Sequence, residues 1–318
     1  MSLEDKSHVA ETGEASKGFL NAIRRGPNHW MLDWDGTLTR RDTLDALVNI
    51  AKEFKPEQDV SSQWNNCVQA YLSDYEAAIE THALKEKPPT TIDGEVKLLK
   101  ALEDVERNSV ARVSASGIFR DLDSAALHLG AKQAVQEGRV QMRKGWNDFL
   151  MFIESRNDST DRLVDRVDII SVNWSQRFIA SCLRAAGGGR SLKIYANELE
   201  GLSEDVLSTG VIGSKSTHTI ISSGDKREYM GYLTRQAGAL STIYVGDSWT
   251  DFECLMDATV GICVRDTPMT SSQKKLDEAF QRLGISCPHI DQLKEVSGKR
   301  CTIAWVKDFN EIRRWLGD

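Results

Sequence analysis

The residues most able to do chemistry are carboxylates, hydroxyls and a lysine that occur in four short segments. In chain order these are Asp33-Trp34-Asp35-Gly36-Thr37, then Ser171-Val172-Asn173, then Lys226, then Gly246-Asp247-Ser248 with Asp251. Transfer of a phosphoryl group to a carboxylate needs a nucleophile, an acid and base for the leaving oxygen, a divalent cation, and fixed donors around the phosphoryl oxygens. Together the four segments can supply all of these.

The first segment provides the groups that would react. Asp33 could attack phosphorus as an ionised carboxylate and form an aspartyl-phosphate intermediate. Asp35 lies two residues on, and therefore on the same side of an extended chain, where it could protonate the leaving alkoxide and then activate water. Gly36 permits the close approach that turns backbone N–H groups toward an anion, and Thr37 belongs to the same phosphate-binding turn.

The last two segments would supply charge. Asp247 and Asp251 add hard oxygen ligands suited to Mg²⁺, which typically takes one or two protein carboxylates, waters and a substrate phosphate oxygen. Lys226, at the start of an expected helix, would neutralise both the carboxylates and the phosphate.

The segment at Ser171 would hold phosphoryl oxygens through the Ser171 hydroxyl and the amides of Val172 and Asn173 at a helix N-terminus. Each segment taken alone has an ordinary structural interpretation. A Ser at a strand end is usually a helix cap, Lys226 reads as a solvated helix residue, and GDSWTD reads as a turn. The Asp33 segment also occurs in turns and calcium loops. Because one phosphoryl-transfer site requires all four in this order, their joint occurrence favours that site.

Buried strands, each followed by a helix, are expected to position these segments. The run HWMLDWDGT is short, apolar and ends in a Gly turn. It fits a buried parallel strand that delivers Asp33 to the carboxyl end of a sheet, where α/β proteins place their sites. VDIISVN, STIYVGD, VGICV and CTIAWV read as further strands that alternate with helices. This rhythm predicts an α/β fold with a parallel, Rossmann-like sheet.

Between the first two segments the pattern becomes helical. Apolar residues recur at spacings of three and four in LDALVNIAKEF, WNNCVQAYLSDYEAAIETHAL and VKLLKALEDVERNSV. We therefore expect a core made of residues 28–42 and 155–318, a helical cap domain at residues 43–154, and a flexible N-terminus at residues 1–27.

Composition disfavours several classes of function. The 318 residues carry a formal charge of −7, which argues against a nucleic-acid partner because a phosphate backbone requires a basic surface. The N-terminal sequence lacks the apolar region of a secretory signal, and no apolar run is long enough to span a bilayer, so we expect a cytoplasmic protein without membrane association. The six cysteines read as reduced structural thiols, and the six histidines lack zinc-ligand spacing.

The motifs DWDGTLT, IIS, the Lys226 region and GDSWTD resemble the four signature motifs of haloacid dehalogenase superfamily phosphatases. This resemblance extends from Trp30 to about Val264. It implies a Rossmann-like core, a mobile helical cap that closes over the substrate, and an obligatory Mg²⁺ ion.

The same resemblance assigns the ligands of that ion. They would be Asp33, the backbone carbonyl of Asp35 and Asp247, with Asp251 acting through water. An acid at Asp35 favours a phosphatase over the dehalogenase and phosphonatase branches, which lack it.

Two longer stretches narrow the resemblance. ANELEG, followed by STG and DK, is similar to the phosphoserine-phosphatase-like branch with a helical cap. That branch usually has Glu where this chain has Asp42, a substrate-binding candidate, and the difference argues against an amino-acid substrate. GDSWTDFECLMDATVGICV and DTLDALVNIA are similar to plant and fungal proteins of the thiamine monophosphate phosphatase kind, which implies that substrate.

A large cap predicts a small phosphorylated metabolite as substrate, because a lid would exclude a folded phosphoprotein or a nucleic-acid duplex. Trp64, Tyr71 and Tyr75 either pack the cap helices together or stack on a heterocycle, and Trp174 is a candidate for the pocket rim. Trp34 should point away from the aspartates. Two alternatives stay open: a pyrimidine nucleotidase or other small-phosphomonoester phosphatase, and a catalytically idle binding module. The sequence leaves the oligomeric state open.

Overall fold

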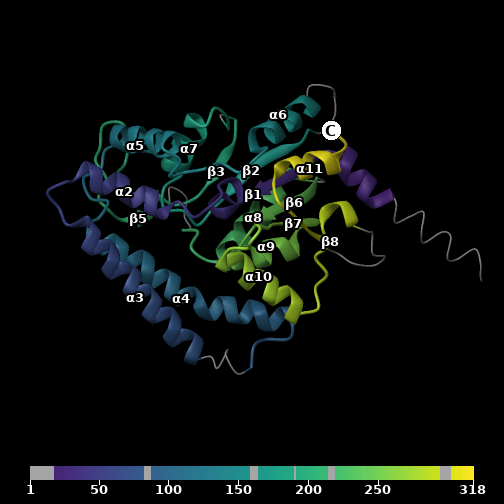
Figure 1. Cartoon of the computed structure of the whole chain (residues 1–318), viewed down its shortest axis with the longest axis horizontal. Coiled ribbons are helices and arrows are strands. Elements are labelled where there is room, and N and C mark those ends of the chain that lie inside the picture. The colour runs from purple at the N-terminus through teal and green to yellow at the C-terminus, as the bar shows by residue number, and fades with distance from the viewer. Residues whose placement is uncertain are drawn as a thin grey trace, which may run out of the picture.

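A six-stranded sheet forms the centre of the molecule (Figure 1). The computed structural model describes residues 18–81, 87–157, 164–189, 191–213, 219–238, 240–293 and 302–318. Every neighbouring pair in the sheet is parallel, and the order is β3-β2-β1-β6-β7-β8. The strands are β1 Asn28–Leu32, β2 Arg166–Ile170, β3 Lys193–Tyr195, β6 Ser241–Gly246, β7 Val260–Val264 and β8 Thr302–Val306. Because the order reverses between β1 and β6, a topological switch point lies there, where open α/β sheets bind ligands.

Helices cover both faces of this sheet, which explains why its strands read as continuous apolar runs. Successive strand residues belong to two different buried clusters: Trp30 and Leu32 of β1 to one, and Met31 to the other. The first cluster includes residues of α6, α7 and α11, and the second includes residues of α8, α9 and α10. The fold is therefore the doubly wound α/β core that the sequence predicts.

The long insertion after β1 is helical. Its helices α3 and α4 lie side by side, α2 contacts α5, and α5 contacts α7 of the core (Figure 1). The helices of the chain are α2 Leu44–Phe54, α3 Val60–Thr81, α4 Ile92–Ser116, α5 Ser124–Gln136, α6 Trp146–Asn157, α7 Gln176–Ala185, α8 Ser223–Ala237, α9 Phe252–Asp257, α10 Ser271–Arg282 and α11 Phe309–Leu316. A small antiparallel pair, β4 Glu198–Leu199 with β5 Ile212–Gly213, follows β3.

Two predicted boundaries differ from the structure. The boundary between cap and core, predicted at residues 154 and 155, falls inside α6. That helix packs on the core: the ring of Phe149 meets the edge of Trp30 at a centroid distance of 5.0 Å and lies 5.3 Å from Phe309. The periodicity alone could not show this, because an amphipathic helix has the same pattern whichever partner its apolar face meets.

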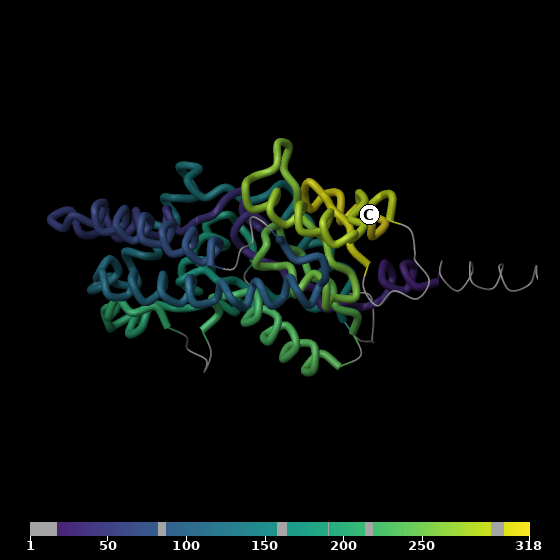
Figure 2. The backbone as a smooth tube through the Cα atoms, turned by 90° about the horizontal axis from the view of Figure 1, so that it is seen from below, coloured from purple at the N-terminus to yellow at the C-terminus, as the bar shows by residue number. Residues whose placement is uncertain are grey.

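The N-terminal boundary differs as well. Residues 18–25, predicted to belong to a flexible segment, are helical, while residues 1–17 lie outside the described part of the chain. Leu20 and Ile23 of this helix are buried in the core. Arg24 stacks over Trp315 of α11 at 5.2 Å, so the helix lies beside the C-terminal one, at the end of the molecule opposite α3 (Figure 2). In the described residues, no helix is long and apolar enough to cross a membrane.

A buried ion pair fastens the start of α4 to the core. The Glu95 side chain is fully buried, and Arg282 of α10 donates to its two carboxylate oxygens at 2.8 and 3.1 Å. Trp249, in the helical turn Trp249–Asp251 after β6, donates its indole N–H to Glu95 Oε1 at 2.7 Å. The insertion is therefore joined directly to the loop that carries Asp247.

Replacing Arg282 by Met should lower the free energy of unfolding by about 3–5 kcal/mol, because the substitution leaves the Glu95 carboxylate buried and without its cationic partner. Arg107→Met is the matched control, since Arg107 pairs with Glu103 on the surface of α4 and such pairs contribute at most about 1 kcal/mol. Urea unfolding of both variants measures the difference. Equal losses would contradict a structural role for the buried pair.

Candidate active site

The carboxyl edge of the sheet brings the four predicted segments together. Asp33 follows β1, Ser171 follows β2 and Asp247 follows β6. Because these three strands are neighbours and parallel, their ends lie at one edge on either side of the switch point. Lys226 reaches the same place from the first turn of α8, as the sequence predicts.

Lys226 is the centre of this arrangement. Its ammonium is 1% exposed and donates to Asp33 Oδ1 at 2.6 Å and to Asp251 Oδ1 at 2.7 Å. The two carboxylates offset the cost of burial and raise the pKa of Lys226, so the side chain stays protonated. The lysine thereby fixes the nucleophile candidate against the segment after β6.

Asp251 organises that segment. Its Oδ1 also accepts a hydrogen bond from the Tyr244 hydroxyl at 2.7 Å, and its Oδ2 accepts the backbone N–H groups of Asp247 and Ser248 at 3.1 and 3.0 Å. Burial alone would raise the pKa of Asp251, but the charge and hydrogen bond of Lys226 outweigh it and hold the pKa below its usual value. Asp251 is thus an ionised anchor that sets the position of Asp247.

Asp35 is held by residues from the start of the insertion and from the β2 end. Its Oδ1 accepts the Thr43 backbone N–H at 2.8 Å and the Thr43 hydroxyl at 2.6 Å. Its Oδ2 accepts the side-chain amide of Asn173 at 3.0 Å. Thr43 is a site residue that the sequence analysis missed, since a Thr before a helix looks like an ordinary cap.

Gly36 makes close packing possible at the switch point. Its φ of +74° lies in the left-handed region, and a Cβ there would lie 2.3 Å from Asp247 Oδ2. Any larger residue would therefore push Asp247 away. The hydroxyl of Thr37 lies 3.4 Å from both Asp33 Oδ2 and Asp247 Oδ1, between the two carboxylates.

Arg143 is a second residue that the sequence analysis missed. It comes from the loop before α6, is 2% exposed, and donates to the carbonyls of Gly36 at 2.6 Å and Thr37 at 2.9 Å. Its guanidinium also binds both oxygens of Asp266 after β7, at 3.0 and 3.2 Å. A lone arginine far along the chain gave no sequence signal, because only the fold brings it behind the Asp33 turn.

A cavity of about 680 Å³ lies between the sheet edge and the helical insertion. The wall on the sheet side carries most of the predicted site residues: Asp33, Asp35, Gly36, Asp42, Val172, Asn173, Trp174, Lys226 and Asp247. Tyr71 and Glu106 come from α3 and α4 on the other side.

Three predicted site residues, Thr37, Ser171 and Asp251, are fully buried and lie behind that wall. The Ser171 hydroxyl accepts the backbone N–H of Asn173 at 3.1 Å. The predicted helix N-terminus at Ser171 is displaced, because α7 begins at Gln176 with Ser175 as its cap. Ser171 therefore shapes the loop after β2.

The carboxylates fit a divalent cation. Ligand oxygens of Asp33, Asp247 and Asp251 lie within 4.8 Å of one another. Burial, followed by the charge of Asp251, raises the pKa of Asp33 to about 7 despite Lys226. Burial also raises the pKa of Asp247 well above its usual value, and the two neighbouring aspartates add to this. A crowd of hard oxygen donors with an excess of negative charge is the donor set that Mg²⁺ takes.

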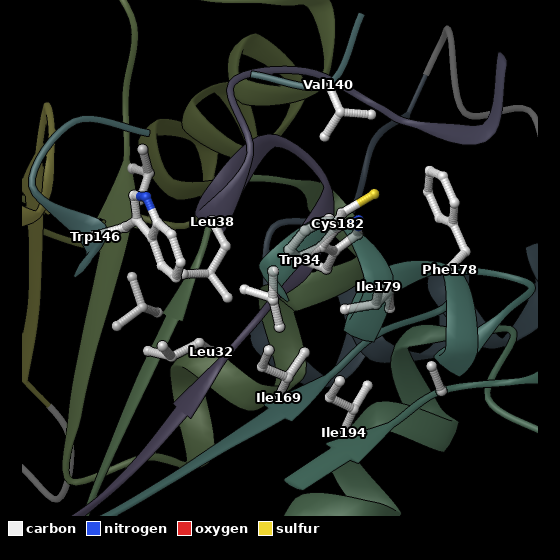
Figure 3. Close-up of a cluster of buried hydrophobic side chains, with 14 of the residues drawn as sticks. Leu32, Trp34, Leu38, Val140, Trp146, Ile169, Phe178, Ile179, Cys182 and Ile194 are labelled. Carbon is white, nitrogen blue, oxygen red and sulfur yellow. The ribbon is translucent and has the colours of Figure 1, made fainter. Parts of the chain in front are cut away.

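The tryptophans near the site differ in position: Trp34 lies in the core, whereas Trp174 lines the cavity. Trp34 is fully buried among apolar side chains such as Leu38, Ile179 and Cys182 (Figure 3). Its indole N–H donates to the Thr43 hydroxyl at 3.1 Å, and that hydroxyl in turn donates to Asp35. Trp174 lines the cavity and packs edge-on against Trp64 of α3, with 5.8 Å between ring centroids. The described cysteines are free thiols, as predicted; Cys301 lies outside the described residues.

Comparison with known proteins gives two similar sequences, while no protein-family model matches. The mitochondrial bifunctional TH2 protein of Arabidopsis thaliana is 26% identical over 273 residues, which cover 80% of this chain and 41% of that protein. A CTO1 family protein of Schizosaccharomyces pombe is 27% identical over 282 residues, covering 85% of this chain and 93% of that one. The chain therefore spans less than half of the TH2 protein and nearly all of the CTO1 family protein.

Among solved structures, a substrate-bound phosphoserine phosphatase complex aligns with 91% of this chain and 98% of its own, at 15% identity and a TM-score of 0.49. A phosphoserine phosphohydrolase-like protein from Francisella tularensis aligns with 90% and 98%, at 12% identity and the same TM-score.

The sheet order and the helices on both faces define a doubly wound α/β fold, and the four motifs lie at one edge of its sheet. At that edge Lys226 contacts Asp33 and Asp251, and Asp247 lies close to both aspartates.

In the metal-free protein, burial and then the charge of Asp42 raise the pKa of Asp35 to about 8. Asp42→Asn removes that like charge, so the pKa of Asp35 should fall. A carboxyl-carbon NMR titration without Mg²⁺ measures the shift. Asp45→Asn is the control, because the charge of Asp45 raises the pKa of Asp42 and its removal leaves the Asp42 carboxylate in place. An equal fall in the pKa of Asp35 in this control would argue against Asp42 as the cause.

Proposed function

We propose that this protein is a Mg²⁺-dependent phosphatase that hydrolyses a small phosphomonoester through an aspartyl-phosphate intermediate on Asp33. The single observation that carries the proposal is the buried contact of Lys226 with Asp33, beside Asp247 and within reach of a cavity that Asp35 also lines. This arrangement places a nucleophile, an acid and a set of cation ligands around one volume.

In the first step, a carboxylate oxygen of Asp33 attacks phosphorus, and the bond between phosphorus and the leaving oxygen breaks. Protonated Asp35 gives its proton to that oxygen, and a pKa of about 8 keeps Asp35 protonated at neutral pH. Lys226 stabilises the charge that develops on the phosphoryl oxygens.

In the second step, Asp35 is a carboxylate and accepts a proton from water. The resulting hydroxide oxygen bonds to phosphorus, the bond from phosphorus to Asp33 breaks, and inorganic phosphate leaves. Thr43 and Asn173 keep Asp35 at the cavity wall through both steps.

Mg²⁺ would be held by the carboxylates of Asp33 and Asp247 and, following the motif resemblance, by the backbone carbonyl of Asp35. When bound, it supplies positive charge to the phosphoryl oxygens. The helical insertion would act as a cap that excludes bulk water from the intermediate.

Thiamine monophosphate is the substrate that we propose, on the strength of the motif similarity around residues 246–264. A pyrimidine nucleoside monophosphate is the second candidate, because Trp64, Tyr71 and Trp174 could stack on a base. A cavity of about 680 Å³ has the size of a small-molecule site, which supports a metabolite as the substrate class.

A panel of phosphomonoesters tests the proposal, with phosphate release measured in Mg²⁺ and in EDTA. Turnover of at least one compound should require Mg²⁺, should be lost in Asp33→Asn, and should fall about 10²–10⁴-fold in Asp35→Asn. Asp257→Asn, a surface carboxylate that pairs with Arg227, is the control and should behave as wild type. An absence of turnover with every compound would instead support the idle binding module.

A further inference from the structure

Two neighbouring loops of the cavity wall are held together from behind by one side chain. Val172 and Asn173 follow β2, Ile221 precedes α8, and all three line the cavity. Asn197 lies between β3 and β4, is 0% exposed, and does not line the cavity. This position sets Asn197 apart from the residues that face the open volume.

The Asn197 side chain uses both ends of its amide. Its Nδ2 donates to the carbonyl oxygens of Val172 at 3.1 Å, Asn173 at 3.2 Å and Ile220 at 2.7 Å. Its Oδ1 accepts the backbone N–H of Ile220 at 2.8 Å. An amide suits this place because it donates and accepts, whereas a carboxylate would turn an acceptor toward three carbonyls.

The backbone around Asn197 continues the same contact. The Asn197 N–H donates to the Asn173 carbonyl at 3.2 Å, and the Gln176 N–H donates to the Asn197 carbonyl at 2.8 Å. The next residue, Glu198, is 2% exposed and accepts the Ser175 hydroxyl at 2.7 Å. The central residues of the segment ANELEG therefore fasten the loop after β2 along its length.

Each of the two loops leads to a donor that holds a carboxylate of the site. Asn173 donates its side-chain amide to Asp35 Oδ2 at 3.0 Å. Lys226, in the first turn of α8, donates to Asp33 Oδ1 at 2.6 Å, and α8 begins shortly after Ile220. A shift of either loop would therefore move a donor away from its carboxylate.

We propose that Asn197 is a positioning residue that fixes the loop of Asn173 relative to the helix start that carries Lys226. This inference rests on the proposed phosphatase function and deepens it. Asn197 acts on the reaction only through other residues, because it lies outside the cavity and its side chain binds backbone groups. A displacement of about 1 Å at a reacting group costs on the order of 10²-fold in rate, so such a residue can still control kcat.

The kinetic test compares Asn197→Ala with Asn28→Ala. Asn28 is the matched control, because it is also 0% exposed and its side chain donates to the carbonyls of Ile23 and Gly26 at 2.8 and 3.0 Å, at the opposite end of β1 from Asp33. Both substitutions leave buried carbonyls without a donor and should lower stability in urea unfolding.

Only Asn197→Ala should lower kcat for the best substrate of the phosphomonoester panel, by about 10–100-fold. KM should change less than about twofold, because the substitution removes no group that lines the cavity.

Three results would overturn the inference: an equal fall in kcat in both variants, a wild-type kcat in a folded Asn197→Ala, or a loss that lies in KM instead of kcat. If alanine prevents folding, Asn197→Ser and Asn28→Ser take the places of the two variants. The serine hydroxyl keeps a polar group beside the carbonyls, and the same division between kcat and KM is expected.

A second measurement does not depend on turnover. Crystal structures of wild type and of the folded Asn197 variant, both without Mg²⁺, give the distance between Asn173 Nδ2 and Asp35 Oδ2, which is 3.0 Å in the wild-type chain. This contact should lengthen beyond hydrogen-bonding distance in the Asn197 variant and persist in the Asn28 variant. An unchanged contact would refute the positioning role while leaving the phosphatase proposal intact. A lost contact in a protein that hydrolyses no ester would support the positioning role and count against the phosphatase.

Discussion

The buried contact of Lys226 with Asp33 and Asp251 is the interaction on which the site depends. An ammonium with 1% exposure is tolerable only where carboxylates offset its desolvation, and these carboxylates follow different strands. The ion triplet therefore fixes β1, α8 and the loop after β6 relative to one another. It leaves the second oxygen of Asp33 beside Thr37 and close to Asp247.

Around these three residues, close packing at Gly36 and buried hydrogen bonds from Arg143 hold the turn that follows Asp33. Gly36 brings the backbone against Asp247, while Arg143 binds the carbonyls on the other side of the turn and is itself oriented by Asp266. Glu95 then connects the insertion to Trp249, two residues from Asp247. The walls of the cavity are thus mechanically connected, which limits how far the start of α4 can move away from the core.

The cavity has two ends with different chemistry. The sheet edge contributes Asp33, Lys226 and Asp247, whereas the insertion contributes Trp64, Tyr71 and Glu106. Under the proposed function, such a division would let the core keep its reaction while the insertion sets specificity. Trp64 of α3 serves both packing and the cavity, because it contacts Trp174 and also lines the open volume.

The sequence by itself determined the α/β class, the strand that ends at Asp33, and the grouping of Asp33, Lys226, Asp247 and Asp251, because short apolar strands and their following turns are local signals. Local signals could not show that α6 packs on the sheet or that Leu20 and Ile23 are buried, since an apolar stripe does not reveal which surface it packs against. Nor could they reveal Thr43, Arg143 or Glu106. These residues gain their roles only when distant segments meet, so tertiary structure alone decided which side chains support the reacting turn and which line its cavity.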